Sequence, residues 1–223
     1  MKRHFDSKNW SKHLFAVASI FIVYSCTDSG NYAGKPFTDS VFTDAPQVIP
    51  GKVWCAYYDL GGEGVAYHDA TEKNHGSGEL NPVNGTYHNE FRIDEGVDIS
   101  YTKEGIDDTL DNIVAPDEMG MFYVGWTAPD EWINYTIDVK ETGAYDICFF
   151  FSAEVDGAIS LSVDGKDVTG ILQIPSTSSP HKWNRIDNLA EVSLKKGTRI
   201  LTLHTKEAGK MNYAWFDFSL KSK

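Results

Sequence analysis

Acidic side chains are the most numerous groups in this chain that could do chemistry. They gather in two places, with Asp107, Asp108 and Asp111 in one and Asp94, Glu95 and Asp98 in the other. Two carboxylates roughly 5–9.5 Å apart could hydrolyse a glycosidic bond, and acids at the right spacing could hold calcium. Neither group follows an acid/base or calcium-loop pattern, so we interpret both as solvated loop charge. The sequence therefore predicts no catalytic residue among its acids.

Histidine and cysteine, the usual metal ligands and nucleophiles, show no pattern that points to either role. The seven His are scattered, and none is spaced as a zinc pair. Cys55 and Cys148 lie in apolar, strand-like runs, where a small buried thiol is the common finding, and a disulfide between them stays open. Neither has a nearby His that would make it a nucleophile. The chain is not expected to be an enzyme.

The overall charge excludes one class of partner. The chain has 20 Lys and Arg against 32 Asp and Glu, a formal net charge of −12. Such a charge repels the phosphate backbone of nucleic acids and the surface of anionic lipids. No cluster of Lys and Arg is dense enough to override this field locally, so neither nucleic acid nor a polyanionic sugar is expected as a partner.

The N-terminus has the three zones of an export signal. Basic residues between Lys2 and Lys12 precede an apolar run of eleven residues at 14–24, which is followed by Ser25 and Cys26. A membrane-spanning helix needs about 20 residues, so this run is too short to be an anchor. A small residue before Cys resembles a bacterial lipoprotein signal, which predicts a signal peptide at residues 1–25 and acylation of Cys26. Ordinary signal cleavage and a structural thiol are the alternatives.

Acylation of Cys26 would decide where the protein resides. The protein would be held at the cell envelope, on the outer membrane of a Gram-negative bacterium, and the lipid would be its sole contact with the membrane. The sequence does not indicate which face of that membrane carries it.

The rest of the chain divides into a linker and a domain. Residues 26–48 are rich in Ser, Thr, Asp, Gly and Pro without a period, which predicts a flexible tether. Residues 49–223 contain short apolar or alternating runs separated by turn residues, which is typical of an all-β domain. About nine antiparallel strands are predicted, at residues 52–58, 97–101, 121–126, 131–139, 143–152, 158–164, 185–194, 198–205 and 213–220. They favour a two-sheet β-sandwich, because one open sheet would expose an apolar face.

Two turns are predicted to be hairpins. Asp164-Gly165 stands between strand-like runs, which is the strongest short hairpin signal. The turn at residues 195–198 is interpreted in the same way. The long irregular segment at residues 60–92 is rich in Gly, Asn and His, and loops of that length are usually functional or disordered.

Several blocks of residues resemble one known family. They are Tyr-Asp-Leu-Gly-Gly-Glu-Gly-Val-Ala-Tyr-His-Asp at residues 58–69, Glu-Gly-Val-Asp-Ile at 95–99, Tyr-Val-Gly-Trp-Thr at 123–127 and Glu-Trp-Ile-Asn-Tyr-Thr at 131–136. With further blocks up to residue 220, they resemble carbohydrate-binding module family 6. The resemblance implies a jelly-roll β-sandwich without catalysis that binds a poly- or oligosaccharide in a loop cleft at one end. Modules of this family usually accompany glycoside hydrolases, so a separate glycoside hydrolase is an implied partner.

The resemblance also implies which residues bind the sugar. Sugar rings present flat C–H faces, so their sites pair aromatic planes with a few amides and carboxylates. Glu63, Phe91 and Asn212 match cleft positions, with turn chemistry as the alternative for Asn212. Pro180 stands where the family commonly presents an extra Trp, and Trp183 matches a more buried Trp of the site. The implied stacking platform is therefore depleted.

Three other tryptophans are assigned to packing. Trp126, Trp132 and Trp215 fall within predicted strands. Large aromatic side chains there usually pack in the core or on the sheet surface. We therefore do not place them in the cleft.

A structural calcium site occurs in many members of this family, and the resemblance implies that it is missing here. The site lies between the first and last strands, where acidic side chains supply oxygen ligands. The matching positions are Trp54, Ala56 and Ala214, none of which offers a side-chain oxygen. A shifted site that uses Asp59 and Asp217 is the alternative. We expect neither a metal nor a cofactor.

Two functions from different classes are compatible with this sequence. The first is a sugar-binding lipoprotein. The second is a protein-interaction or assembly subunit on the same fold, with sugar binding lost through the Trp-poor loop. Exposed aromatics clustered in the loop cleft would favour the first, and a flat apolar patch on a sheet face would favour the second. A small glycoside hydrolase, the third hypothesis, lacks a visible acid/base pair.

Overall fold

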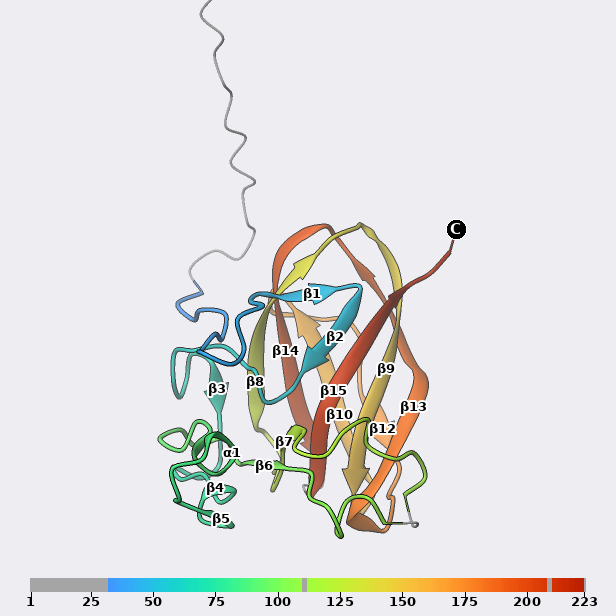
Figure 1. Cartoon of the computed structure of the whole chain (residues 1–223). Helices are drawn as coiled ribbons and strands as arrows, with labels where there is room; N and C mark the ends of the chain where they lie inside the picture. The colour runs from blue at the N-terminus through green and yellow to red at the C-terminus, as the bar shows by residue number, and fades with distance from the viewer. Residues whose placement is uncertain (1–31, 110–111, 208–209, 223) are drawn as a thin grey trace, which may run out of the picture.

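The computed structural model describes residues 32–109, 112–207 and 210–222. These residues form two large β-sheets packed face to face, with a small sheet and one short helix beside them (Figure 1). The all-β sandwich expected from the sequence is confirmed. The predicted signal peptide at residues 1–25 and Cys26 lie outside the described residues. Within the described ranges, no helix has the length and apolar character needed to cross a bilayer.

The first large sheet has seven strands. Its path runs through β1 (Gln47–Ile49), β8 (Trp132–Val139), β14 (Gly197–Glu207), β10 (Gly157–Val163) and β11 (Lys166–Asp167). Two short strands pair off this path, β3 (Tyr67–His68) with β8 and β12 (Leu172–Ile174) with β10. All of these pairs are antiparallel except β1 with β8.

The second large sheet has six strands. Its path runs through β13 (Ser179–Leu194), β9 (Gly143–Ala153), β15 (Met211–Leu220), β7 (Phe122–Val124) and β6 (Ile99–Tyr101), and β2 (Gly51–Trp54) pairs with β15. The long segment between β2 and β6 holds the rest, namely β3, β4 (Ser77–Gly78), β5 (Asn81–Pro82) and α1 (Tyr87–Glu90).

Each of the nine predicted runs overlaps an observed strand. The Asp164-Gly165 turn joins β10 to β11 with φ values of 50° and 75°, the left-handed pair that a two-residue hairpin needs. The prediction for residues 195–198 is wrong, because β13 pairs with β9 whereas β14 pairs with β8 and β10. That turn carries the chain from one sheet to the other.

β9 shows how the sequence builds two packed faces. Phe149 and Phe151 are fully buried in the core between the two sheets. Phe150 belongs to a second buried cluster on the other face and stacks on Trp183 at a centroid distance of 5.4 Å. The β6–β7 loop lies against this cluster, because the N–H groups of residues 113–114 donate to the Trp183 carbonyl at 2.9 and 3.0 Å. Both faces of the six-stranded sheet are therefore covered here.

Part of the predicted tether is packed onto the domain. Lys35 and Leu60 form a backbone bridge with N···O distances of 2.8 and 2.7 Å. Phe37 is only 6% exposed and stacks on Tyr57 at a centroid distance of 5.8 Å. The packed structure therefore begins before residue 49, because isolated aromatics without a period still find an apolar surface.

Candidate functional site

A pocket of about 390 Å³ opens at the loop end of the sandwich, the lower end in Figure 1. It lies where the segments after β7 and β9 meet the starts of β13 and β15. The residues that line it are Leu80, Tyr123, Trp126, Glu154, Pro180, His181, Lys210 and Asn212. Ligand pockets typically measure about 300–1,000 Å³, so this volume suits a small molecule or one or two units of a polymer.

Trp126 is the exposed aromatic residue of this pocket. It has a positive φ of 49° and is 43% exposed. The chain leaves β7 here because the Gly125 N–H donates to the Asp98 carbonyl at 2.9 Å. A Cβ at position 125 would come within 2.8 Å of the Asn212 side-chain oxygen, so glycine is needed. The prediction that Trp126 packs within a strand is wrong, because β7 ends at Val124 and the turn leaves the indole at the surface.

Asn212, a predicted binding residue, lies in the pocket wall with its amide nitrogen already engaged. Nδ2 donates to the Pro180 carbonyl at 2.7 Å and to Ser152 Oγ at 3.1 Å. A carbonyl can only accept, so the amide nitrogen must face Pro180. Asn212 therefore fixes the beginning of β13, and among the described residues its side-chain oxygen accepts no hydrogen bond.

Glu154 and Lys210 place two opposite charges at the rim. Lys210 Nζ lies 3.3 Å from Glu154 Oε2, and both side chains are exposed. Their backbones are also joined, because the Glu154 N–H donates to the Lys210 carbonyl at 3.1 Å. The Lys210 N–H donates to the Thr127 carbonyl at 3.0 Å. An ammonium beside a carboxylate offers donors and acceptors to neighbouring hydroxyl groups.

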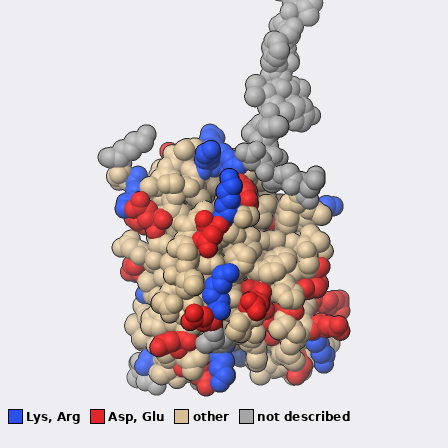
Figure 2. All heavy atoms as spheres, turned by 180° about the vertical axis from the view of Figure 1, so that it is seen from behind, with Lys and Arg blue, Asp and Glu red and all other residues tan. Residues whose placement is uncertain are grey.

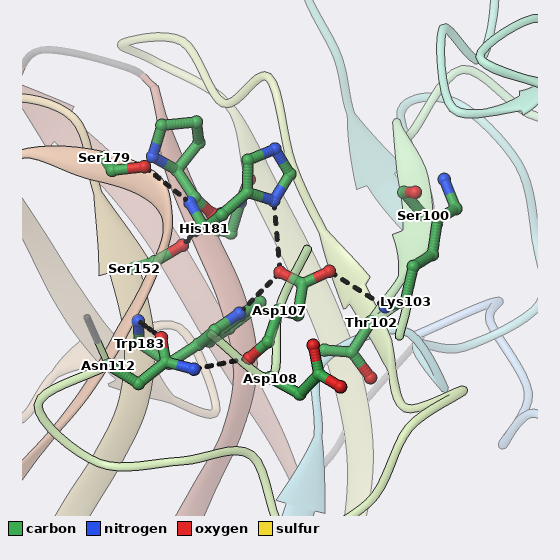
Figure 3. A network of polar contacts seen from close by, with 12 residues as sticks. Ser100, Thr102, Lys103, Asp107, Asp108, Asn112, Ser152, Ser179, His181 and Trp183 are labelled. Carbon is green, nitrogen blue, oxygen red and sulfur yellow. Dashed lines mark hydrogen bonds and ion pairs between the residues drawn. The ribbon is translucent and has the colours of Figure 1, made fainter. Parts of the chain in front are cut away.

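His181 lines the pocket and is backed by a buried carboxyl group (Figure 3). His181 Nδ1 lies 3.1 Å from Asp107 Oδ1, and Trp183 Nε1 donates to the same oxygen at 2.8 Å. The Lys103 N–H donates to Asp107 Oδ2 at 2.9 Å. The Asp107 side chain is 1% exposed, whereas that of His181 is 43% exposed. The β6–β7 loop thus holds the histidine against the pocket from behind.

The four predicted binding residues do not meet in one pocket. Asn212 lines the pocket, and Trp183 is fully buried behind it in the contact with Asp107. Phe91 is 3% exposed and stacks on Phe122 at a centroid distance of 4.3 Å, within the core. It lies beside a different hollow on the surface.

Glu63 also lies away from the pocket lining. It is exposed, its Oε1 lies 2.5 Å from His68 Nδ1, and its Oε2 accepts from the Asp69 N–H at 3.1 Å. These contacts close the loop between β2 and β3. Their effect on ligand binding stays a prediction.

Sequence reasoning missed six residues of the pocket lining, among them Trp126, Glu154, His181 and Lys210, and two signals could have found three of these four. Glu154 directly follows β9 and Lys210 directly precedes β15, and each lies within three residues of an end of the predicted strands 143–152 and 213–220. His181 follows Pro180 in the loop where the resemblance places a stacking residue. Trp126 gave no such signal, because only the backbone turn after β7 exposes it.

Buried acids lie in the neighbouring loops. Burial and the nearby charge of Asp69 raise the pKa of Glu131 to about 7. The hydrogen bonds from the N–H groups of Ala128 and Ala70 lower this pKa, but by less than burial raises it. Burial likewise raises the pKa of Asp98 to about 6. Across residues 32–109, 112–207 and 210–222, no group of three or more His, Cys, Asp or Glu could hold a metal ion.

The residues at the family's calcium position do not fit the ion. The two strands are adjacent, since the Cys55 N–H donates to the Ala214 carbonyl at 2.9 Å. The carbonyl oxygens of Trp54 and Tyr57 accept from the Gln47 amide at 3.3 and 3.2 Å, and the Trp54 N–H donates to Gln47 Oε1 at 2.7 Å. Backbone oxygens that could serve a cation are thus engaged by an uncharged side chain, with no carboxylate at the matching positions.

A second hollow lies on the outer face of the seven-stranded sheet. Its lining residues include Trp132, Asn134, Ser160, Ser162, Thr202 and His204, from β8, β10 and β14. Trp132 is its one aromatic residue. This surface provides a comparison for the pocket at the loop end.

The surface charge agrees with the overall composition. On the face seen in Figure 2, several Lys and Arg side chains adjoin one another near the top, and elsewhere they are dispersed among Asp and Glu.

An antiparallel sandwich with an aromatic side chain and several hydrogen-bonding groups at its loop end has the architecture of a carbohydrate-binding module. The family model described as carbohydrate binding module (family 6) matches residues 92–220, more than half of the chain. The chain belongs to carbohydrate-binding module family 6. A search of curated proteins found no match.

The first of three similar solved structures shows the same fold. A family 6 module from Clostridium stercorarium in complex with cellobiose is 14% identical, with a TM-score of 0.52 over 80% of this chain and 100% of that chain. The C-terminal family 6 module of a laminarinase from Zobellia galactanivorans is 26% identical over 44% of this chain and 79% of that chain, with a TM-score of 0.40. A module of lichenase 5A from Cellvibrio mixtus, in complex with cellotriose, is 19% identical over 57% of this chain and 88% of that chain, with a TM-score of 0.42.

Proposed function

We propose that this protein binds a poly- or oligosaccharide in the pocket at the loop end of its sandwich. The observation that carries the proposal is the exposed indole of Trp126 beside the polar groups of Asn212, His181 and the Glu154–Lys210 pair. An aromatic face stacks on the C–H face of a sugar ring, and the polar groups accept and donate to its hydroxyls. Family membership supports a carbohydrate as the ligand class.

The ligand is expected to be a neutral sugar that binds with modest affinity. Trp126 and the buried Tyr123 are the aromatic residues of the pocket lining, so the sugar stacks on one exposed ring rather than between two. The pocket has Pro180 where a second aromatic plane would add stacking area. One stacked face and a few hydrogen bonds give dissociation constants of the order of 0.1–1 mM.

The test is calorimetric titration of the protein without its export signal against neutral oligosaccharides, beginning with cellobiose and cellotriose. Trp126→Ala is expected to weaken binding about tenfold or more through loss of the stacking surface. Its thermal stability should change little, because an exposed side chain contributes about 0.5 kcal/mol or less to folding.

Trp132→Ala is the matched control, since it removes a tryptophan from the hollow on the sheet face. It is expected to bind like the wild type. Loss of binding in Trp132→Ala with full binding in Trp126→Ala would move the site to the sheet face. No binding by the wild type across a broad glycan array would favour the assembly-subunit hypothesis instead.

We propose binding without turnover, with hydrolysis left to a separate glycoside hydrolase. Among the pocket residues, Glu154 is the one carboxylate, and Lys210 is its ion-pair partner. Glycoside hydrolysis requires a pair of carboxylates across the bond. Release of reducing ends from any bound polysaccharide by the purified protein would refute this part of the proposal.

We also propose that Cys26 is acylated and holds the protein on the outer membrane. The support is the basic and apolar segment that precedes Cys26 in the sequence. Metabolic labelling with a fatty-acid probe should mark the wild type and leave Cys26→Ala unlabelled, with the Cys148→Ala variant as the control. Label that persists in Cys26→Ala would exclude this residue as the acceptor.

A further inference from the structure

The network behind His181 determines which of its ring nitrogens carries a hydrogen. Asp107 Oδ1 accepts from the Trp183 indole N–H at 2.8 Å, and Oδ2 accepts from the Lys103 backbone N–H at 2.9 Å. An indole N–H and a backbone N–H can only donate, so both carboxyl oxygens act as acceptors. The His181 nitrogen that faces Oδ1 is Nδ1, at 3.1 Å. A carboxylate can only accept, so Nδ1 is the donor to Asp107 Oδ1.

The other ring nitrogen is left for the pocket. In a neutral imidazole one nitrogen donates and the other accepts, so Nε2 becomes an acceptor. Nε2 lies on the side of the ring away from Asp107 (Figure 3), and among the described residues it has no hydrogen-bond partner. The ring lines the same pocket as Trp126 and is 43% exposed.

The position of the ring is also fixed. The Pro180 carbonyl next to it accepts from the Asn212 amide at 2.7 Å and from Ser152 Oγ at 2.6 Å. The His181 N–H donates to Ser179 Oγ at 3.2 Å. Backbone and ring are thus held by separate contacts, which is how a binding group is preorganised for its ligand.

We propose that His181 determines specificity for the bound sugar, by accepting a hydrogen bond at Nε2 from a sugar hydroxyl, and that Asp107 is the positioning residue that fixes this tautomer. The inference rests on the proposed function, because it requires a sugar at Trp126. It restricts the ligand chemistry: the group that faces Nε2 must be a hydrogen-bond donor such as a hydroxyl, since an ether oxygen or a carboxylate would place a second acceptor there.

Two substitutions separate the contact with Asp107 from the contact with the sugar. An Asn side chain ends near the position of Nδ1 and can still donate to Asp107, but it leaves the position of Nε2 empty. A Gln side chain reaches the position of Nε2 and can accept there. His181→Asn is therefore expected to weaken binding about fivefold, whereas His181→Gln should stay within about twofold of the wild type.

The affinities are measured by calorimetry with the neutral oligosaccharide that binds the wild type in the titrations above, cellobiose or cellotriose first. Wild-type affinity in His181→Asn overturns the inference. If Trp126→Ala still loses binding in that case, the proposed function survives. If no oligosaccharide binds the wild type, the proposed function fails and the sugar contact fails with it.

A spectroscopic measurement tests the tautomer without any ligand. Long-range proton–nitrogen correlations of the 15N-labelled protein report which nitrogen of His181 is protonated, and the Nδ1–H form is expected. Added oligosaccharide should shift the Nε2 resonance and leave Nδ1 nearly unchanged. In Asp107→Asn the preference for the Nδ1–H form should weaken. A wild-type protein in the Nε2–H form overturns the inference whatever the sugar titrations give, and this result does not depend on whether Asp107→Asn folds.

Discussion

Two loop regions of this molecule carry the residues that the sequence marks for ligand binding, and they use those residues differently. Around Trp126, an aromatic ring and several polar groups line a pocket. Around Phe91, the rings of Phe37, Tyr57 and Phe122 lie within 4.3–5.8 Å of the Phe91 ring, and these aromatic faces meet one another. The first region presents its aromatic surface to solvent and the second buries it.

The difference arises from the backbone and not from residue type. Trp126 follows Gly125 in a left-handed turn that ends β7, so no neighbouring strand covers its ring. Phe91 follows α1 in a segment held by Arg92, whose guanidinium donates to the Tyr58 and Asp59 carbonyls and pairs with Glu95. An aromatic residue in a loop is available to a ligand only where the chain around it leaves one ring face uncovered.

The largest expected effect comes from truncating Phe91. Phe91→Ala should lower the free energy of unfolding by about 3–5 kcal/mol, because it removes a buried ring and leaves a cavity. Urea denaturation followed by tryptophan fluorescence measures this loss. Trp126→Ala, with its exposed ring, should cost about 0.5 kcal/mol or less.

Sugar binding by the folded Phe91→Ala protein shows whether Phe91 contacts the ligand or only stabilises the fold. Titration below the unfolding transition should give Phe91→Ala an affinity close to that of the wild type. If Phe91→Ala keeps its stability and loses binding, the comparison is reversed and the cleft lies in the second region.

A smaller effect is expected from a buried acid close to the first region. Glu131 accepts from the Ala128 N–H, two residues from Trp126, and from the Ala70 N–H in the loop after β3. Its folded pKa of about 7 lies above the ordinary glutamate value of 4.5, so the folded chain holds the proton more tightly than the unfolded chain. This contribution is fully present below about pH 4.5 and is lost as the pH rises through about 7.

The wild type should therefore lose of the order of 2 kcal/mol of stability between pH 5 and pH 8 through this group. Glu131→Gln should reduce this dependence of stability on pH. Glu141→Gln, at an exposed position, should leave it unchanged. Thermal melting across this pH range measures the slopes. Identical slopes in the wild type and Glu131→Gln would contradict the assignment.

The fold could be predicted from the sequence to a large extent, and the pocket could not. Strands such as β8 and β10 alternate apolar and polar residues, so their type and place follow from period alone. β3, β4 and β5 have two residues each and therefore show no period. Asn212 was predicted because it stands in a recognisable block. Trp126 was assigned to packing because the apolar run extends two residues beyond the end of the strand, and the turn that exposes its ring depends on contacts with Asp98 and Asn212, distant in sequence.

The smallest expected effect concerns Gln47, whose amide bonds Trp54, one of the positions that resemble the family's calcium ligands, and Tyr57, which packs in the Phe91 cluster. Gln47→Ala removes three hydrogen bonds, and the Tyr57 carbonyl and the Trp54 N–H lose their partner, so it should cost about 1–2 kcal/mol. Gln173→Ala, at an exposed position in β12, is the control and should cost less than about 0.5 kcal/mol.

Calcium should not change the melting temperature of the wild type or of either variant, because no carboxylate stands at the matching positions. Melting curves with calcium and with chelator measure both effects, and a rise of several degrees in the wild type on adding calcium would mean that an ion, and not the amide alone, stabilises this region.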